Sequence, residues 1–147
     1  MDEMTGNILN SDHLEDLLFH SLRAVYLFER AEIETFGLDY QQMFLLKYLK
    51  RQSPLRVSDI AAVLRIPAFS ATRLVGHLEP KKLIARTRDS ADRRNIYISI
   101  TPDGLDMVAR IENHAIGLIT GNLAGFDEKS AGAIIEMVKH LDKILGV

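Results

Sequence analysis

The sequence predicts a mainly α-helical protein with one β-hairpin placed between helices. Apolar residues recur at three- or four-residue intervals over most of the chain, which is the period of an amphipathic helix. Two short segments, 84–88 and 96–100, have instead the pattern of strands. All four prolines lie between residues 54 and 102, so neither terminal region contains a strong helix breaker.

Two helices are expected before the centre of the chain. Residues 13–35 carry apolar side chains at helical intervals and stop at Gly37, a residue type that commonly ends helices. A second helix is expected from about Asp39 to Arg51, and Ser53-Pro54 marks its end. Its predicted core residues are Phe44, Leu45, Tyr48 and Leu49.

Residues 57–79 predict a helix, a short turn and a second helix. The first helix has Val57, Ile60, Ala61 and Leu64 at helical spacing, and Ser58 is placed to cap it. Pro67 then interrupts the pattern, because it lacks an N–H and its φ suits the first position of a new helix. This second helix is expected over 67–79, with a buried stripe made by Ala71, Leu74, Val75 and Leu78.

The opposite face of the second helix is small, polar and basic. It carries Ser70, Thr72, Arg73, Gly76 and His77. Small residues allow a helix to lie deep in a groove, and arginine reaches guanine or phosphate in DNA. Taken alone, the same pattern is explained equally well by an ordinary solvated helix face.

Residues 84–100 predict a hairpin that follows these helices. Its second strand alternates isoleucines with Tyr97 and Ser99, and the tip, DSADRRN, contains no large apolar residue. Four arginines lie on this hairpin, as expected for a wing along the DNA backbone or minor groove: Arg86, Arg88, Arg93 and Arg94. After it, Thr101 is predicted to cap a new helix and Pro102 to occupy its first position.

Residues 92–104 are similar to the motif D-x-R-x(5)-L-T-x-x-G. They contain Asp92-x-Arg94 followed by Ile100-Thr101-x-x-Gly104, with Ile in place of Leu. That motif is the wing signature of the MarR family of winged helix-turn-helix transcription regulators. TRLVGHLEPKKLI resembles the recognition helix of that family and its exit. Residue-level likeness is concentrated between about Leu55 and Gly104, although the order of elements matches over nearly the whole chain.

Two departures from the family pattern carry structural consequences. Pro67 and Phe69 stand where the family tends to have small polar residues, which leaves the base preference open. Pro80-Lys81-Lys82 replaces the usual glycine-containing exit, which predicts that the recognition helix ends early, near Glu79.

The resemblance implies a homodimeric transcription regulator, with repression as the expected mode and activation as the alternative. We expect it to recognise a pseudo-palindromic operator, with helix 67–79 in the major groove and wing 84–100 at the minor groove or backbone. It also implies a small effector, often aromatic or anionic, that weakens DNA binding. In the wing signature the Asp92 carboxylate is spaced to orient an arginine. The expected DNA-binding residues are Ser70, Thr72, Arg73, His77, Arg86, Arg88, Arg93 and Arg94. Residues able to line an effector pocket are Phe19, Tyr26, Tyr40, Phe44 and Tyr48, and none is assigned that role because aromatic stripes are more often core.

The ends of the chain carry more apolar surface than a small DNA-binding module needs. Residues 102–120 and 131–145 predict helices, separated by the loop GNLAGFDEKS with Asp127 as a cap. A dimerisation bundle explains this surface, and plain intramolecular packing is the alternative. We therefore expect a dimerisation helix (1–36), a winged lobe (37–104) and C-terminal dimerisation helices (105–147).

Charge is distributed unevenly along the chain. From Arg51 to Arg94 there are ten Lys or Arg against four Asp or Glu, a local charge of +6 within a chain whose total is −2. An acidic scaffold therefore masks a basic lobe, which favours a nucleic-acid partner. The alternative is a winged-helix module whose wing binds an acidic protein surface.

Several other function classes have little support in the sequence. There is no cysteine, which excludes disulfides and thiolate metal sites, and there is no HExxH, GxSxG or phosphate-binding glycine loop. Glu136 and His140 lie four residues apart, a spacing that favours a local side-chain contact over a metal site. We expect no catalytic residues, metal or cofactor, and a soluble, cytoplasmic protein without a signal peptide.

Overall fold

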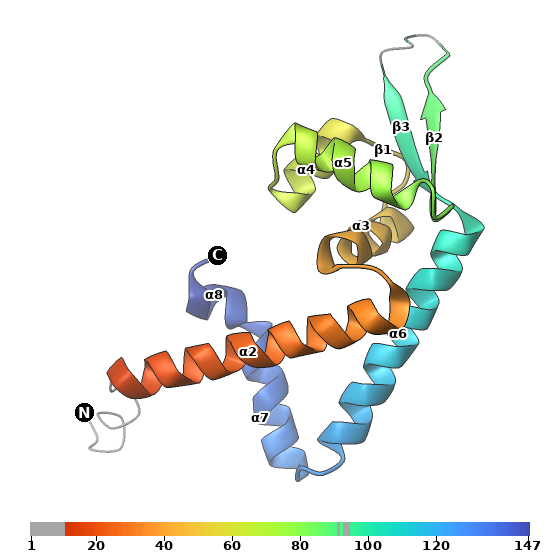
Figure 1. Ribbon diagram of the computed structural model, residues 1–147. Coiled ribbons are helices and arrows are strands. Elements are labelled where there is room, and N and C mark those ends of the chain that lie inside the picture. The colour runs from red at the N-terminus through yellow and green to blue at the C-terminus, as the bar shows by residue number, and fades with distance from the viewer. Residues whose placement is uncertain (1–10, 91, 93–94) are drawn as a thin grey trace. The chain divides into compact units, whose positions relative to one another are not determined.

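The computed structural model describes residues 11–90, 92 and 95–147, and it confirms a mainly α fold with one β-hairpin (Figure 1). The chain forms two compact units, one ending at Leu105 and one beginning at Asp106. The described elements of the first unit are α2 (Ser11–Phe36), α3 (Tyr40–Arg51), β1 (Leu55–Arg56), α4 (Val57–Leu64), α5 (Ala68–Leu78), β2 (Ile84–Arg88), β3 (Ile96–Ile100) and the start of α6 (Pro102–Leu123). The second unit contains the rest of α6, α7 (Glu128–Lys139) and α8 (Leu141–Leu145).

A left-handed glycine and a capped helix start form the corner between α2 and α3. Gly37 has a φ of 66° and its N–H donates to the Ile33 carbonyl at 2.8 Å, which ends α2 as predicted. The Asp39 carboxylate accepts the Gln42 N–H at 2.9 Å, and the Gln42 side-chain oxygen accepts the Asp39 N–H at 3.2 Å. Leu38, between these two devices, is buried, so the corner is anchored in the core.

The start of α4 differs from the prediction. The predicted cap by Ser58 is wrong: Arg56 is the N-cap residue, and the Asp59 carboxylate accepts its N–H at 3.0 Å. The pairing of β1 with β3 ends at Arg56, and the chain turns into the helix directly after it. The helix therefore begins at Val57, one residue before the serine.

The three strands form an antiparallel sheet in the order β1-β3-β2. Residues paired across the strands share a face, so Leu55, Ile98 and Arg86 form one row. Ile98 is fully buried, which makes this the side of the sheet that faces the core. On the other side, Arg56, Tyr97 and Thr87 form a second row. The two-residue β1 was not predicted, because so short a strand carries no periodic pattern.

The core of the first unit lies between α3, α4, α5 and the sheet. Its most deeply buried side chains include Leu38, Leu45, Leu46, Leu49, Ile60, Val75, Leu78 and Ile98. On α3, the predicted core positions Leu45 and Leu49 are buried, whereas Phe44 and Tyr48 are only half-buried. The core face of α3 is therefore turned toward Met43 and Leu46.

The C-terminal helices also differ from the prediction. The loop is shorter than predicted, because α6 continues to Leu123 and α7 begins directly after Asp127. The Asp127 carboxylate accepts the Ser130 N–H at 2.9 Å and its hydroxyl at 2.8 Å; these bonds, the backbone one first, lower the pKa of Asp127. The single helix expected over 131–145 is two helices, since the backbone at His140 leaves the helical region. Within the described ranges, no helix has the length and apolar character needed to span a bilayer.

Gly104 lies at a close approach between backbone segments, which yields a stability prediction. A Cβ at this position would collide with the Leu83 carbonyl oxygen and lie 2.7 Å from Ile100 Cγ1. Gly104→Ala should therefore lower the free energy of unfolding in urea by about 2–3 kcal/mol. Gly76→Ala is the control, because a Cβ there meets nothing within 4 Å, and it should leave stability unchanged or raise it by up to about 1 kcal/mol. Equal stability of the two variants would contradict this account of Gly104.

Candidate nucleic-acid interface

The buried stripe of α5 is confirmed, and it determines what the helix exposes. Its four apolar residues are all buried: Ala71, Leu74, Val75 and Leu78. Thr72, Arg73 and His77 lie off this stripe and are exposed, and Ser70 is half-exposed. The Thr72 hydroxyl donates to the Ala68 carbonyl at 3.0 Å, so its hydrogen is already engaged within the helix. Arg73 is the cation that this face presents to solvent.

The predicted early end of this helix is also confirmed. The expected range was 67–79; α5 spans Ala68–Leu78, with Pro67 as the N-cap residue and Glu79 as the C-cap residue. Lys82 has a φ of 59°, a left-handed conformation that favours glycine. Lys82 therefore adopts the left-handed backbone conformation that a glycine in the usual exit would adopt more easily.

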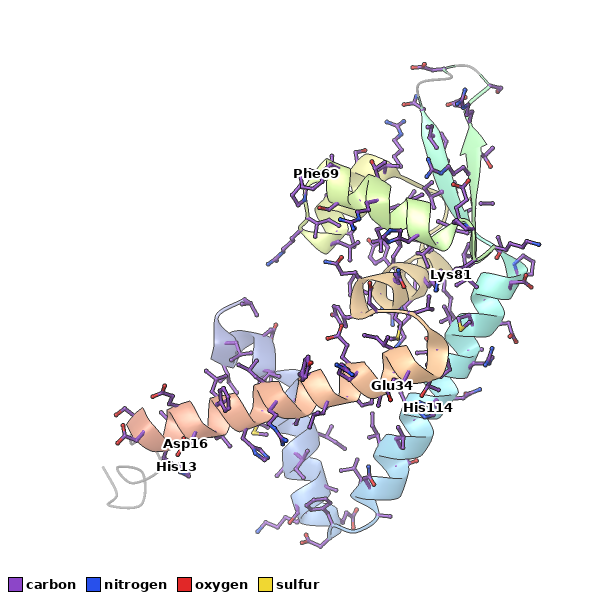
Figure 2. The ribbon with its side chains drawn as sticks, in the orientation of Figure 1. His13, Asp16, Glu34, Phe69, Lys81 and His114 are labelled. Atoms are coloured by element: carbon purple, nitrogen blue, oxygen red, sulfur yellow. The ribbon has the colours of Figure 1, made fainter. Side chains whose placement is uncertain are left out.

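Lys81, in the same exit turn, contacts the end of α2. Lys81 is labelled in Figure 2. Its ammonium group donates to the Gly37 carbonyl at 2.7 Å. A cation is favourable at the C-terminus of a helix, where carbonyl groups lack partners within the helix. The exit of α5 is thereby fastened to the end of α2, a connection that sequence periodicity does not reveal.

Thr101 joins the start of α6 to the same exit turn, and its predicted capping role is confirmed. Its hydroxyl accepts the Gly104 N–H at 3.0 Å and donates to the Lys82 carbonyl at 2.7 Å. The Thr101 N–H donates to the Leu83 carbonyl at 3.1 Å. The Thr-x-x-Gly part of the wing signature is thus a junction that holds the base of the hairpin against the exit of α5.

Arg86 is placed differently from an arginine that projects freely from a wing. Its position opposite Ile98 directs it to the core side of the sheet, where its Nε lies 2.8 Å from a carboxylate oxygen of Glu79. About a third of the side chain is exposed, so the ion pair contributes at most about 1 kcal/mol. The pair links β2 to the end of α5 and neutralises one of the cations that we assigned to DNA binding.

Arg56 is an additional cation of this lobe that the predicted site did not include. Its Nη2 donates to the Tyr97 hydroxyl at 3.2 Å, and its guanidinium carbon lies 5.5 Å from the centre of the Tyr97 ring. The hydrogen bond to Tyr97 is the main reason that the pKa of Arg56 is raised above its ordinary value. The pairing of β1 with β3, which the sequence did not predict, brings these two residues together.

The tip of the hairpin is described in part. The Asp89 N–H donates to the Asn95 carbonyl at 3.0 Å, and the Asn95 N–H donates to the Asp92 carbonyl at 2.9 Å, so backbone bonds extend beyond the strands. Arg88, at the end of β2, is exposed, and so is Asp92. The predicted DNA-binding residues Arg93 and Arg94 lie outside the described residues, so the role of Asp92 in orienting Arg94 stays a prediction.

Among the residues that the structure describes, no group of three or more acidic or histidine side chains is arranged to hold a metal ion. The Glu136 carboxylate accepts from the Lys139 ammonium at 2.6 Å. His140 lies at the C-cap of α7, outside the helical spacing on which the predicted contact with Glu136 depended.

Two helices joined by a tight turn, followed by a hairpin that completes a small sheet, make this unit a winged helix-turn-helix module. Residues 36–95 match the sequence profile of the MarR family. The chain is 34% identical over 99 residues to the HTH-type transcriptional repressor MdtR of Bacillus subtilis. That match covers 65% of this chain and 64% of MdtR, which is less than two thirds of the relative's length. These matches support the assignment of the winged-helix lobe to the MarR family of regulators.

Solved structures share the fold over most of the chain. The YusO protein from Bacillus subtilis is 27% identical, with a TM-score of 0.72 over 91% of this chain and 98% of YusO. Streptococcus pneumoniae FabT, whose structure is in complex with DNA, has a TM-score of 0.76 at 16% identity over 93% of this chain and 98% of FabT. At that identity the likeness to FabT establishes the fold alone.

The Arg86–Glu79 pair distinguishes two arginines of the same strand. Because a carboxylate already neutralises Arg86, Arg86→Ala should weaken DNA binding less than Arg88→Ala does. Arg88→Ala should also reduce the slope of log affinity against log salt by about 0.9 for each phosphate that the variant no longer neutralises. Fluorescence anisotropy with duplex DNA at several salt concentrations measures both quantities. A larger loss of affinity for Arg86→Ala, with its fold intact, would show that the pair opens on DNA.

Proposed function

We propose that this protein is a homodimeric transcriptional repressor that binds a pseudo-palindromic operator in double-stranded DNA. The observation that carries the proposal is the outer face of α5, where Thr72, Arg73 and His77 are exposed, in a lobe with a local charge of +6. In helix-turn-helix proteins the second helix enters the major groove, and α5 is that helix. The hairpin then follows the backbone or the adjacent minor groove. The repressor role of MdtR supports this assignment.

Exposed apolar side chains support the dimer. On α2 they include Leu14, Leu17, Leu18, Phe19, Leu22 and Val25; on α7 and α8 they include Ile135, Met137, Val138, Leu141, Ile144 and Leu145. A monomeric protein rarely exposes large contiguous apolar patches, because their hydration is unfavourable. A second copy of the chain covers the apolar face of each of these helices and supplies a second recognition helix, as a two-fold symmetric operator requires.

We also propose that a small aromatic or anionic effector weakens DNA binding. The first unit offers a row of aromatic rings along α3, with centroid distances of 6.0 Å from Tyr40 to Phe44 and 6.4 Å from Phe44 to Tyr48. Tyr40 is exposed and the other two are half-buried, so the row is partly accessible to a planar ligand. On α2, Phe19 and Tyr26 are exposed.

Binding to duplex DNA should depend steeply on salt. The arginines of α5 and the wing would displace condensed counterions, and a dimer making about 6–10 phosphate contacts should lose roughly 10³–10⁵ in affinity between 50 and 200 mM salt. The measurement is a salt titration of binding to the DNA that flanks the protein's own gene. A log–log slope near zero would be incompatible with the proposed function.

Dimer formation and operator geometry can be tested with α8. Leu141→Asp combined with Leu145→Asp places two carboxylates in the proposed interface, at a cost of several kcal/mol when they are buried unpaired. Sedimentation should show monomers, and footprinting should show loss of the second half-site. The control is Lys143→Asp, which introduces the same residue type at a charged position of α8 and should leave the dimer intact.

The wild-type dimer should also require two half-sites about one helical turn, ~10 bp, apart. Inserting five base pairs rotates one half-site to the opposite side of the duplex and should abolish simultaneous binding. A folded double variant that remains dimeric, or a wild type that tolerates the half-turn insertion, would reject this architecture.

A further inference from the structure

Phe69 is exposed in a position where a core role is excluded. Its side chain has 76% relative exposure, and no other large apolar side chain among the described residues of the first unit is as exposed (Figure 2). It is the second residue of α5, directly after Ala68. An apolar ring exposed to water contributes nothing to the core, and a partner that covered it would gain the free energy of removing it from water.

The helical geometry places Phe69 at the centre of the face that points away from the core. Successive residues are rotated by about 100° around a helix axis, so Phe69, Arg73 and Gly76 lie on one side. The buried stripe, Ala71 to Leu78, lies almost directly opposite. Phe69 therefore shares its face with the cation proposed to contact DNA, which makes DNA the partner that this surface fits by charge.

The neighbours of Phe69 allow a close approach to a groove. Gly76 has no side chain, and a Cβ added there would meet nothing within 4 Å, so nothing projects from the helix at that point. The Thr72 hydroxyl is turned toward the Ala68 carbonyl. N-terminal residues of a recognition helix are those that meet base edges in the major groove, and Phe69 lies in the first turn.

An aromatic ring has no hydrogen-bond donor or acceptor with which to read a base, but it can read an apolar group. In the major groove that group is the C5-methyl of thymine, which distinguishes A·T pairs from the others. Resting on the proposed DNA-binding function, we propose that Phe69 determines operator specificity by packing its ring against the C5-methyl of a thymine in each half-site. Arg73, one turn further along α5, supplies the adjacent contact to phosphate or guanine.

The experiment uses the full-length protein and a duplex enriched by it from a library of random sequences. Each thymine of one half-site is replaced in turn by deoxyuridine, which removes only the C5-methyl and keeps every hydrogen-bonding group. For the wild type, one replacement should weaken binding about fourfold, which corresponds to about 0.8 kcal/mol for one buried methyl at 1.4 kcal/mol per tenfold. For Phe69→Ala the same replacement should have no effect.

Two further variants serve as controls. Phe69→Leu keeps an apolar side chain and should retain part of the sensitivity to deoxyuridine. Thr72→Ser removes a methyl group from the neighbouring surface of α5 and keeps the hydroxyl, so it tests whether threonine makes the methyl contact. If Phe69 makes that contact, the deoxyuridine replacement should weaken binding of Thr72→Ser as much as it weakens binding of the wild type. Sedimentation of each variant should show the wild-type oligomeric state.

The outcomes separate this inference from the proposed function. Salt-dependent binding of the enriched duplex together with equal deoxyuridine sensitivity in wild type and Phe69→Ala would overturn the role of Phe69 alone. Loss of sensitivity in Thr72→Ser but not in Phe69→Ala would assign the methyl contact to threonine and overturn it as well. A changed oligomeric state in Phe69→Ala would place the ring in a protein interface and overturn it too. Failure to enrich any duplex would reject DNA binding itself, and this inference with it.

Discussion

Burial of four apolar side chains along α5 determines which side chains this helix exposes on its outer face. Ala71, Leu74, Val75 and Leu78 fix the rotation of the helix about its own axis, because any other rotation would expose them to water. Phe69 and Arg73 are directed outward for the same reason. The chemistry of the outer face thus follows from the packing of the inner one.

The ends of α5 and the base of the hairpin are held by polar contacts that use charged groups of the basic lobe. Lys81 fastens the exit of α5 to the end of α2, and Arg86 joins β2 to Glu79. Thr101 links the start of α6 to the same turn. These contacts hold the recognition helix and the wing in a fixed relation, which lowers the entropy that ordering them would cost on binding. The ten Lys and Arg of residues 51–94 therefore include cations that brace the lobe and cations that face outward.

The terminal helices also have apolar faces, but these faces are not buried within one copy of the chain. Their apolar residues have the helical spacing of a core face, yet on α2, α7 and α8 most of them remain exposed. A surface with the pattern of a core and the exposure of a solvent face is typical of an obligate interface. The same physical effect that orients α5 thus accounts for the proposed dimer.

The sequence by itself determined the elements and the inner face of α5, because helical and strand periodicity are local properties. It determined α2, α4, α5 and the hairpin to within a few residues, the buried stripe of α5, its end near Glu79 and the cap at Thr101. Only the tertiary structure decided features that depend on partners distant along the chain or on packing. The helix α4 begins directly after the pairing of β1 with β3 ends, one residue before Ser58, and this pairing brought Arg56 to Tyr97. The register of β2 turned Arg86 toward Glu79, and the fold placed Lys81 beside Gly37. A charge is visible in a sequence, but whether it is neutralised depends on which groups the packed chain brings within a few ångströms of it.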